Sequence, residues 1–374
     1  MTNKERKEKR YKKRKAERDK KKNEFVSQFD DFEWVFSYDH LYDSYKKSRR
    51  NVSWKTSVKS YITQAPLLIN QTYNELHNGS FQSDGFYEFN INERGKVRHI
   101  RSVTIKERVV QRCLCDYALI PVLSRSFIYD NSASLQGKGY HFAMNRLCNH
   151  LRDHYRENGN SGYILTFDFS KYFDNISHEV CKKIIRDNFT DKRIIALVNH
   201  FIDCFGDVGL GLGSQISQIF ALAVANRLDH YVKEVLRIHG YGRYMDDGYL
   251  IHKDKDYLKY CLSEIEEICT DLGIVLNKKK TQIIKISRGF TWLKCQFFLT
   301  DSGKIIKKVA RTSITRHRRK LKSLRKFLNE KKLTIEDINT SQQTWKSYAQ
   351  NFNSYNTVKS IDRLYEELFK EELT

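Results

Sequence analysis

Two adjacent carboxylates, Asp246 and Asp247, constrain this chain more than any other feature of its sequence. They stand between a tyrosine and an apolar run, in the segment Tyr-Met-Asp-Asp-Gly-Tyr-Leu at residues 244–250. Neighbouring side chains on a strand point to opposite faces, so both carboxylates can approach one cation only at a turn. The segment therefore predicts a β-hairpin over residues 241–252. Asp-Asp-Gly is equally typical of a solvated β-turn, and taken alone the segment leaves that alternative open.

A third carboxylate, Asp168, ends an apolar and β-branched stretch of the sequence. This stretch, residues 163–169, predicts a buried strand, and a helical pattern follows at about residues 179–188. Asp168 alone could be a strand-end cap, which is common. Together with the hairpin it predicts a cluster of three carboxylates. Hard divalent cations prefer carboxylate and phosphate oxygens, and two such ions can clamp the attacking and leaving oxygens of a phosphoryl transfer.

Seven segments resemble, in order and spacing, the sequence blocks of reverse transcriptases, and specifically of the compact bacterial enzymes of diversity-generating and defence elements. They are residues 95–101, 135–139, 167–173, 209–218, 244–247, 277–281 and 290–295. The resemblance implies an α+β right-hand polymerase with fingers, a ferredoxin-like antiparallel palm and a helical thumb. The expected divisions are a basic arm (1–24), fingers (25–160), a palm with the catalytic site and primer grip (161–300), and a basic thumb (301–374).

Periodicity and turn residues predict the elements of the palm. After the glycine-rich turn, apolar residues at helical spacing predict one helix from about residue 216 to 235. A second amphipathic helix is expected at 256–272, with Gly273 placed to end it. A strand near 283–287 and the segment 290–299 are expected to complete the sheet, with the hairpin of Asp246 and Asp247 at its centre. Upstream, residues 86–100 predict another hairpin.

The resemblance implies a role for each residue of the site. Asp168 and Asp246 would hold two Mg²⁺ ions (Mn²⁺ could substitute), and the Phe169 carbonyl would be a further ligand. Asp247 would contribute to the primer-side ion or its surroundings, and Lys280 would give a proton to the leaving pyrophosphate. The candidates for the triphosphate are Lys96, Arg98 and Arg101, those near the new base pair are Leu212, Gly213 and Gln215, and those of the primer grip are Trp292, Leu293 and Lys294.

Two positions bear on substrate choice and accuracy. Phe173 lies where the family places a ring under the incoming sugar, which predicts deoxynucleotides and argues against an RNA-dependent RNA polymerase. The alternative is that this ring only packs the strand–helix junction. Leu212 stands where retroviral enzymes have a glutamine, and leucine cannot hydrogen-bond near the base pair. This predicts low fidelity on a dedicated element RNA.

The charge of the chain indicates a nucleic-acid partner. Lys and Arg outnumber Asp and Glu by 67 to 45, a formal net charge of +22, which favours polyanions. The expected partners are template RNA, primer or cDNA and dNTPs, with a structured non-coding RNA and an accessory protein as further ones. Residues 4–22 predict a solvated helix or disordered arm, compatible with RNA contact. The basic amphipathic pattern at residues 304–328 predicts a solvated face or a surface along a duplex.

The remaining features bear on compartment and on competing functions. No apolar run approaches the roughly 20 residues of a membrane span, and no signal peptide is visible, so we expect a cytoplasmic protein that does not bind membranes. Eight cysteines without a Cys-x-x-Cys pair predict reduced thiols. A phage-defence polymerase making untemplated or repeat DNA, and a catalytically silent RNA-binding scaffold, are the alternative functions. Burying three carboxylates without cations costs free energy, which argues against the scaffold.

Overall fold

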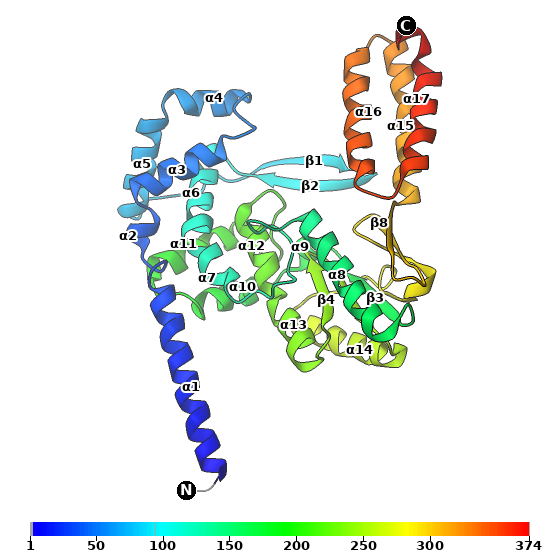
Figure 1. Ribbon diagram of the computed structural model, residues 1–374. Coiled ribbons are helices and arrows are strands. Elements are labelled where there is room, and N and C mark those ends of the chain that lie inside the picture. Colours follow the sequence, from blue (N-terminus) through cyan, green and yellow to red (C-terminus); the bar gives the residue numbers. More distant parts are fainter. Residues whose placement is uncertain (1–2, 94, 374) are drawn as a thin grey trace. The chain divides into compact units, whose positions relative to one another are not determined.

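The computed structural model describes residues 3–93 and 95–373, which form two compact units (Figure 1). The first unit contains Met1–Gly139, Phe169–Val235 and Glu264–Leu276, and the second contains Tyr140–Asp168, Leu236–Ser263 and Asn277–Thr374. Helices are combined with antiparallel sheets, which confirms the expected α+β class. No helix in the described ranges is both long and apolar enough to cross a membrane. All eight cysteines are free thiols, as predicted.

The first unit is helical apart from one hairpin. Its elements are α1 (Asn3–Val26), α2 (Phe32–Val35), α3 (Tyr38–Ser48), α4 (Thr56–Thr63), α5 (Ala65–His77), β1 (Tyr87–Glu93), β2 (Lys96–Ser102), α6 (Ile105–Leu114), the π-helical turn η1 (Cys115–Leu119), α7 (Ile120–Ser124), α9 (Tyr172–Asn175), α10 (His178–Arg186), α11 (Lys192–Asp203), α12 (Gln215–Val224), α13 (Asn226–His230) and the π-helical turn η2 (Tyr231–Val235). The hairpin β1–β2 and helix α10 lie where the sequence predicts them. The basic run at residues 4–22 is helical, within α1.

The prediction of a single helix from residue 216 to 235 is wrong. The chain leaves α-helical geometry at Ala225, where φ is −81° and ψ is 0°, and α13 and η2 follow as separate turns. The break involves a single residue, so the apolar residues on either side of it keep nearly the helical spacing in the sequence. The periodicity therefore does not reveal it.

The second unit contains a four-stranded sheet, which we call the palm sheet after the expected domain. Strands β3 (Tyr163–Asp168), β4 (Gly240–Tyr244), β5 (Asp247–His252) and β6 (Gln282–Lys285) pair in the order β4-β5-β3-β6, and every pair is antiparallel. This is the split arrangement that the order of elements predicts. Within the hairpin, β5 is a central strand and β4 is an edge strand. Helix α14 (Lys255–Asp271) joins the hairpin to β6, and Gly273 follows it with φ +69°.

The expectation that residues 290–299 complete this sheet is wrong. Strands β7 (Phe290–Trp292) and β8 (Cys295–Leu299) pair with β9 (Ile305–Val309) in a separate three-stranded sheet. A 3₁₀ turn, η3 (Ile286–Arg288), and Gly289 with φ +74° turn the chain out of β6. Because residues 305–309 are taken up by β9, the basic helix begins only at Arg311 and not near residue 304.

Two hydrophobic cores hold the second unit together. Helix α8 (Tyr140–Asn158) buries Leu147 and Leu151, one turn apart, against Ile164 of β3 and Trp292 and Phe297 of the small sheet. At the C-terminal end, α15 (Arg311–Asn329), α16 (Ile335–Gln350) and α17 (Tyr355–Leu373) form a three-helix bundle around a second cluster. Burial of one apolar stripe per helix leaves the basic residues of α15 on the solvent side.

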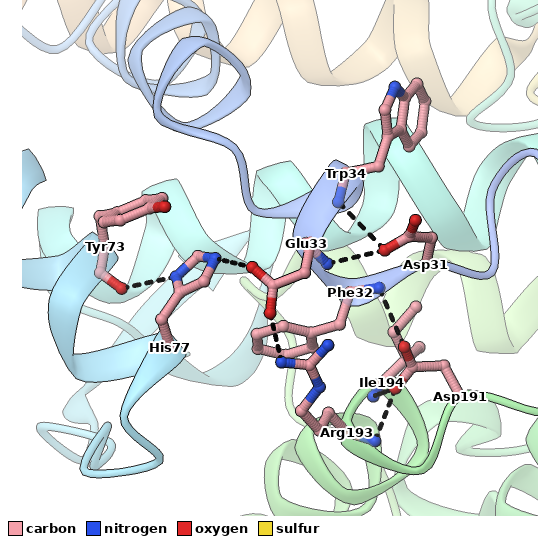
Figure 2. A network of polar contacts seen from close by, with 9 residues as sticks. All are labelled: Asp31, Phe32, Glu33, Trp34, Tyr73, His77, Asp191, Arg193 and Ile194. Atoms are coloured by element: carbon pink, nitrogen blue, oxygen red, sulfur yellow. Dashed lines mark hydrogen bonds and ion pairs between the residues drawn. The ribbon is translucent and has the colours of Figure 1, made fainter.

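In the first unit, a polar network ties α2 to helices far away in the sequence (Figure 2). Asp191 caps the N-terminus of α11 by accepting the backbone N–H groups of Arg193 and Ile194, and its other oxygen accepts the N–H of Phe32 at 3.0 Å. Glu33 lies 2.5 Å from Arg193 and 2.8 Å from the Nε2 of His77 in α5. One carboxylate thus satisfies the exposed N–H groups of two helix starts.

We expect Asp191→Ala to lower the free energy of unfolding by about 1–2 kcal/mol, because a helix cap and a tertiary hydrogen bond are lost together. Asp187→Ala is the matched control, since the Asp187 side chain lies in an exposed ion pair with Lys183, which contributes about 0.5 kcal/mol or less. Chemical denaturation of both variants measures the difference. Equal effects of the two substitutions would contradict the role given to Asp191.

Candidate active site

The palm sheet places two carboxylates opposite each other. Asp168 is the last residue of β3 and Asp247 the first of β5, and the register pairs them directly. Cβ atoms of such cross-strand partners are roughly 4.5–5.5 Å apart, and like charges there repel. Asp246 stands beside them in the two-residue turn between β4 and β5. The predicted hairpin and the expected proximity of the three carboxylates are both observed.

Burial and the neighbouring carboxylates shift the pKa of Asp247. Its burial, and then the nearby charges of Asp246 and Asp168, raise its pKa to about 7, while Lys280 and Lys294 act in the opposite direction. Asp168 is itself only 4% exposed. Removing carboxylates from water and placing like charges together both disfavour the ionised form. Burial and the two neighbouring carboxylates thus outweigh Lys280 and Lys294 in their effect on the pKa of Asp247.

Two residues of the segment after α14 bind Asp168. Lys280 Nζ donates to Asp168 Oδ2 at 2.5 Å, and Asn277 Nδ2 donates to Oδ1 at 3.2 Å. The backbone N–H of Asn277 also donates to the Asp168 carbonyl. Burial lowers the pKa of Lys280, but the hydrogen bond and charge of Asp168 outweigh it, and the pKa lies above its ordinary value. Asn277 opens the fourth sequence block, yet sequence reasoning assigned it no role.

The turn that carries Asp246 is strained, and a buried arginine stabilises it. Met245 has φ +57°, a left-handed conformation that primed hairpin turns normally reserve for glycine. Arg243, fully buried, donates from Nη1 to the Met245 carbonyl at 2.8 Å. Gly248 permits close packing of the strands, because a Cβ there would lie 2.2 Å from the Phe167 ring. No sequence pattern singled out Arg243, since a lone arginine before the carboxylates carries no sign that it is buried.

The three residues expected to grip the primer divide into two kinds. Trp292 is 3% exposed and packs edge-on against Tyr249 in the core. Leu293 and Lys294 form the two-residue turn between β7 and β8, with φ +45° and +63°. Lys294 is exposed, and its charge lowers the pKa of Asp247. Only the turn is thus available to a ligand, and it is positioned by the buried tryptophan.

The triphosphate candidates lie on the hairpin of the first unit. Alternation along β2 puts Arg98 and Arg101 on opposite faces, so the two cannot serve one ligand from the same side. Arg101 donates to the Phe205 carbonyl at 2.8 Å and pairs with Glu88. Arg98 is about half exposed and pairs with Glu93. The side chain of Lys96 lies outside the described residues.

The glycine-rich block packs on the base of this hairpin. The Leu212 carbonyl accepts the N–H of Arg101, and Gly213, with φ +115°, passes so close that a Cβ would lie 2.9 Å from the Arg101 carbonyl. Gln215 begins α12 and donates from Nε2 to Asp116 at 3.2 Å. Strand β2 therefore holds the backbone of Leu212 and Gly213, and Asp116 of η1 holds the side-chain amide of Gln215.

Two neighbouring aromatic residues that follow β3, Tyr172 and Phe173, differ in how far they are buried. Tyr172 is buried, donates its hydroxyl to the Ala221 carbonyl and contacts the Phe169 ring. Phe173 is only partly buried, and its carbonyl accepts the N–H of Leu210. The strand–helix junction is packed by Tyr172, which leaves the Phe173 ring available for another role. The Phe169 backbone pairs with Leu276 in an isolated bridge.

The donor set of the palm has the chemistry of a divalent-cation site. Carboxylates and a backbone carbonyl are hard oxygen ligands, and burial together with the charges of Asp246 and Asp168 raises the pKa of Asp247 to about 7. Within residues 3–93 and 95–373, no group of three or more His, Cys, Asp or Glu side chains is arranged so that it could hold a metal ion. One oxygen of Asp168 is instead engaged by Lys280.

Comparison with known proteins gives a consistent family. A profile described as "Reverse transcriptase (RNA-dependent DNA polymerase)" matches residues 90–297. The chain is 24% identical over 217 residues to the COX1/OXI3 intron 1 protein of Saccharomyces cerevisiae, covering 54% of this chain and 25% of that protein. It is 24% identical over 245 residues to protein YkfC of Escherichia coli, covering 53% and 62%. The chain thus spans less than two thirds of either relative.

Two solved structures are similar over part of the chain. Apo telomerase from Candida tropicalis, truncated from its C-terminal domain, has a TM-score of 0.47 and 15% identity, covering 60% of this chain and 55% of that one. Telomerase from Candida albicans in complex with a TWJ fragment of telomeric RNA has a TM-score of 0.45 and 14% identity, covering 62% and 46%.

The strained turn of β7 and β8 leads to a test of backbone strain. We expect Lys294→Gly to be more stable to unfolding than Lys294→Ala by roughly 1 kcal/mol, because only glycine adopts the left-handed conformation freely. Both variants lose the same charge, so denaturation midpoints report the backbone alone. A Lys294→Ala variant as stable as Lys294→Gly would show that this turn stores no strain.

Proposed function

Because this chain belongs to the reverse transcriptase (RNA-dependent DNA polymerase) family, we propose that it copies an RNA template by adding deoxynucleotides to a primer 3′-hydroxyl. The observation that carries the proposal is the pairing of Asp168 with Asp247 across two central strands, with Asp246 beside them. When bound, two Mg²⁺ or Mn²⁺ ions would supply the positive charge that the attacking oxygen and the leaving pyrophosphate need.

The residues of the palm divide this chemistry among them. Asp168 and Asp246 would hold the cations with the carbonyl of Phe169, and Asp247 would add to the primer-side charge. Lys280 remains protonated, because its pKa lies above the ordinary value. It can therefore give a proton from Nζ to the leaving pyrophosphate. The turn of Leu293 and Lys294 would position the primer end.

The residues of the first unit would select the nucleotide. Arg98 is the better triphosphate candidate, because it pairs with the exposed Glu93, whereas the Arg101 guanidinium is engaged by the Phe205 carbonyl as well as by Glu88. Leu212 offers no side-chain hydrogen bond to a base pair. We therefore propose low fidelity, on a dedicated RNA of a bacterial or phage retroelement. A structured non-coding RNA and an accessory protein are the further partners that we propose.

A phage-defence role is the other biological setting for the same chemistry. The polymerase would then make untemplated or repeat DNA. Neighbouring genes distinguish the two: a template repeat with a variable target gene indicates a retroelement, and a cluster of immunity genes indicates defence.

Primer extension tests the activity. On an RNA template with Mg²⁺ and dNTPs, we expect the wild type to extend a primer and the double variant Asp246→Asn, Asp247→Asn to lose at least about 10³-fold in rate, because charge stabilisation of the transition state is removed. Omitting the divalent cation should abolish extension equally.

Asp256→Asn is the matched control for this charge change. Asp256 is exposed and pairs only with Lys259, so its loss should leave extension unchanged. If wild type and double variant were equally inactive with RNA co-purified from the host, yet bound that RNA alike, the catalytically silent scaffold would be the better explanation.

Phe173 offers a separate test of sugar selection. We expect Phe173→Ala to raise the use of rNTPs relative to dNTPs by on the order of tenfold or more, because the ring that excludes a 2′-hydroxyl is removed. The ratio of kcat/KM for the two nucleotides measures this. Tyr172→Phe is the control, since it removes one buried hydrogen bond and should affect stability alone. An unchanged ratio in Phe173→Ala would mean that the ring only packs.

A further inference from the structure

Helix α1 concentrates positive charge that the polymerase chemistry does not use. Residues 4–22 contain thirteen Lys or Arg and four Asp or Glu, a net charge of +9 out of +22 for the whole chain. From Glu5 to Glu24 every residue of the helix is exposed. Phe25 and Val26, at its end, are its only large aliphatic or phenyl side chains. An isolated helix with so many like charges is destabilised by their repulsion.

The cations of α1 include one continuous row. Lys7, Arg10, Arg14, Arg18 and Lys21 follow one another at intervals of three or four residues, which places them on one face of the helix. With Tyr11 and Glu17 they line a single hollow of about 590 Å³. We call the five cations the cationic stripe.

Ion pairing within α1 occurs off this face. Glu8 pairs with Lys12 at 2.9 Å and Lys20 with Glu24 at 3.8 Å. In the part of the chain that the structure describes, none of the five stripe cations has an ion-pair partner. Glu17 is the acidic side chain that lines the hollow with the five cations, so the stripe keeps a net positive charge.

The chemistry of the stripe selects its partner. A coiled coil needs apolar residues at this spacing, and a membrane-surface helix needs an apolar face; α1 has neither. From Lys7 to Lys21 the stripe is about 21 Å long, while each strand of a duplex presents a phosphate about every 3.4 Å. Tyr11, 61% exposed among these cations, offers a ring on which an unpaired base can stack.

We propose that the cationic stripe of α1 binds the sugar-phosphate backbone of a structured RNA, with Tyr11 against an unpaired base. The inference rests on the proposed function only for the choice of RNA over DNA. Binding releases counterions and relieves repulsion along the helix, so affinity falls steeply with salt. The stripe shares no residue with the carboxylate cluster, so the two can be altered independently.

Two full-length variants with equal charge change test the proposal. The stripe variant replaces Lys7, Arg10, Arg14, Arg18 and Lys21 by Gln, and the control replaces Lys9, Lys12, Lys13, Lys15 and Lys20 by Gln. Glutamine has nearly the helix propensity of lysine and arginine, so α1 should persist in both. The Kd for a bulged RNA hairpin is measured by fluorescence anisotropy at several salt concentrations between about 50 and 300 mM, over which the affinity of such contacts changes strongly.

We expect the stripe variant to reduce the slope of log Kd against log salt by about 4, and the control by less than about 1. Tyr11→Ala should weaken binding of the bulged hairpin but not of a fully paired one. Equal slopes in the two variants overturn the proposal, since charge without geometry would then suffice. Preference for a DNA duplex of the same sequence, or for vesicles containing anionic lipid, over the RNA overturns the choice of partner.

Failure of this inference can be told from failure of the proposed function. Primer extension by the wild type is measured on the same preparation. If the wild type extends the primer and the two variants have equal slopes, the proposal for the stripe is wrong and the proposed polymerase activity stands. The expected slopes without extension support the stripe and count against the polymerase.

Discussion

Asp168 and Asp247 repel each other across the pairing of β3 and β5, and the surrounding palm is organised to hold them there. Lys280 and Asn277 bind both oxygens of Asp168, and the charge of Lys294 acts on Asp247. Even so, the pKa of Asp247 rises to about 7. A slip of one residue in this ladder would send the two carboxylates to opposite faces. The apolar residues beneath the sheet fix the register and so keep the charges together.

Left-handed backbone recurs where the palm presents its functional groups. Met245 lies in the turn of the carboxylates, and Leu293 and Lys294 form the turn of the predicted primer grip. Such conformations cost of order 1–3 kcal/mol each and persist where the surroundings determine them. A buried arginine holds the first turn by the Met245 carbonyl, and a buried tryptophan precedes the second. The strain is therefore compatible with the rigid positioning that the proposed two-cation chemistry would require.

Local patterns predicted some parts of the fold well and others poorly. The hairpin at residues 86–100, the turn at Asp246 and the helix stop at Gly273 follow from alternation, turn residues and a left-handed glycine, all of which act within a few residues. The break at Ala225 and the separation of β7 and β8 from the palm sheet could not be predicted. Both depend on a change of chain direction that leaves the spacing of apolar residues unaltered.

The sequence by itself determined which residues could carry the chemistry, since three carboxylates, a lysine and the block order are properties of the chain. It also determined the basic surplus and the spacing of the stripe on α1. Only the tertiary structure decided that Asp168 faces Asp247 and that Lys280 and Asn277 hold Asp168. The physical reason is that strand pairing and burial join residues 79 to 112 positions apart, and no local pattern encodes such partners.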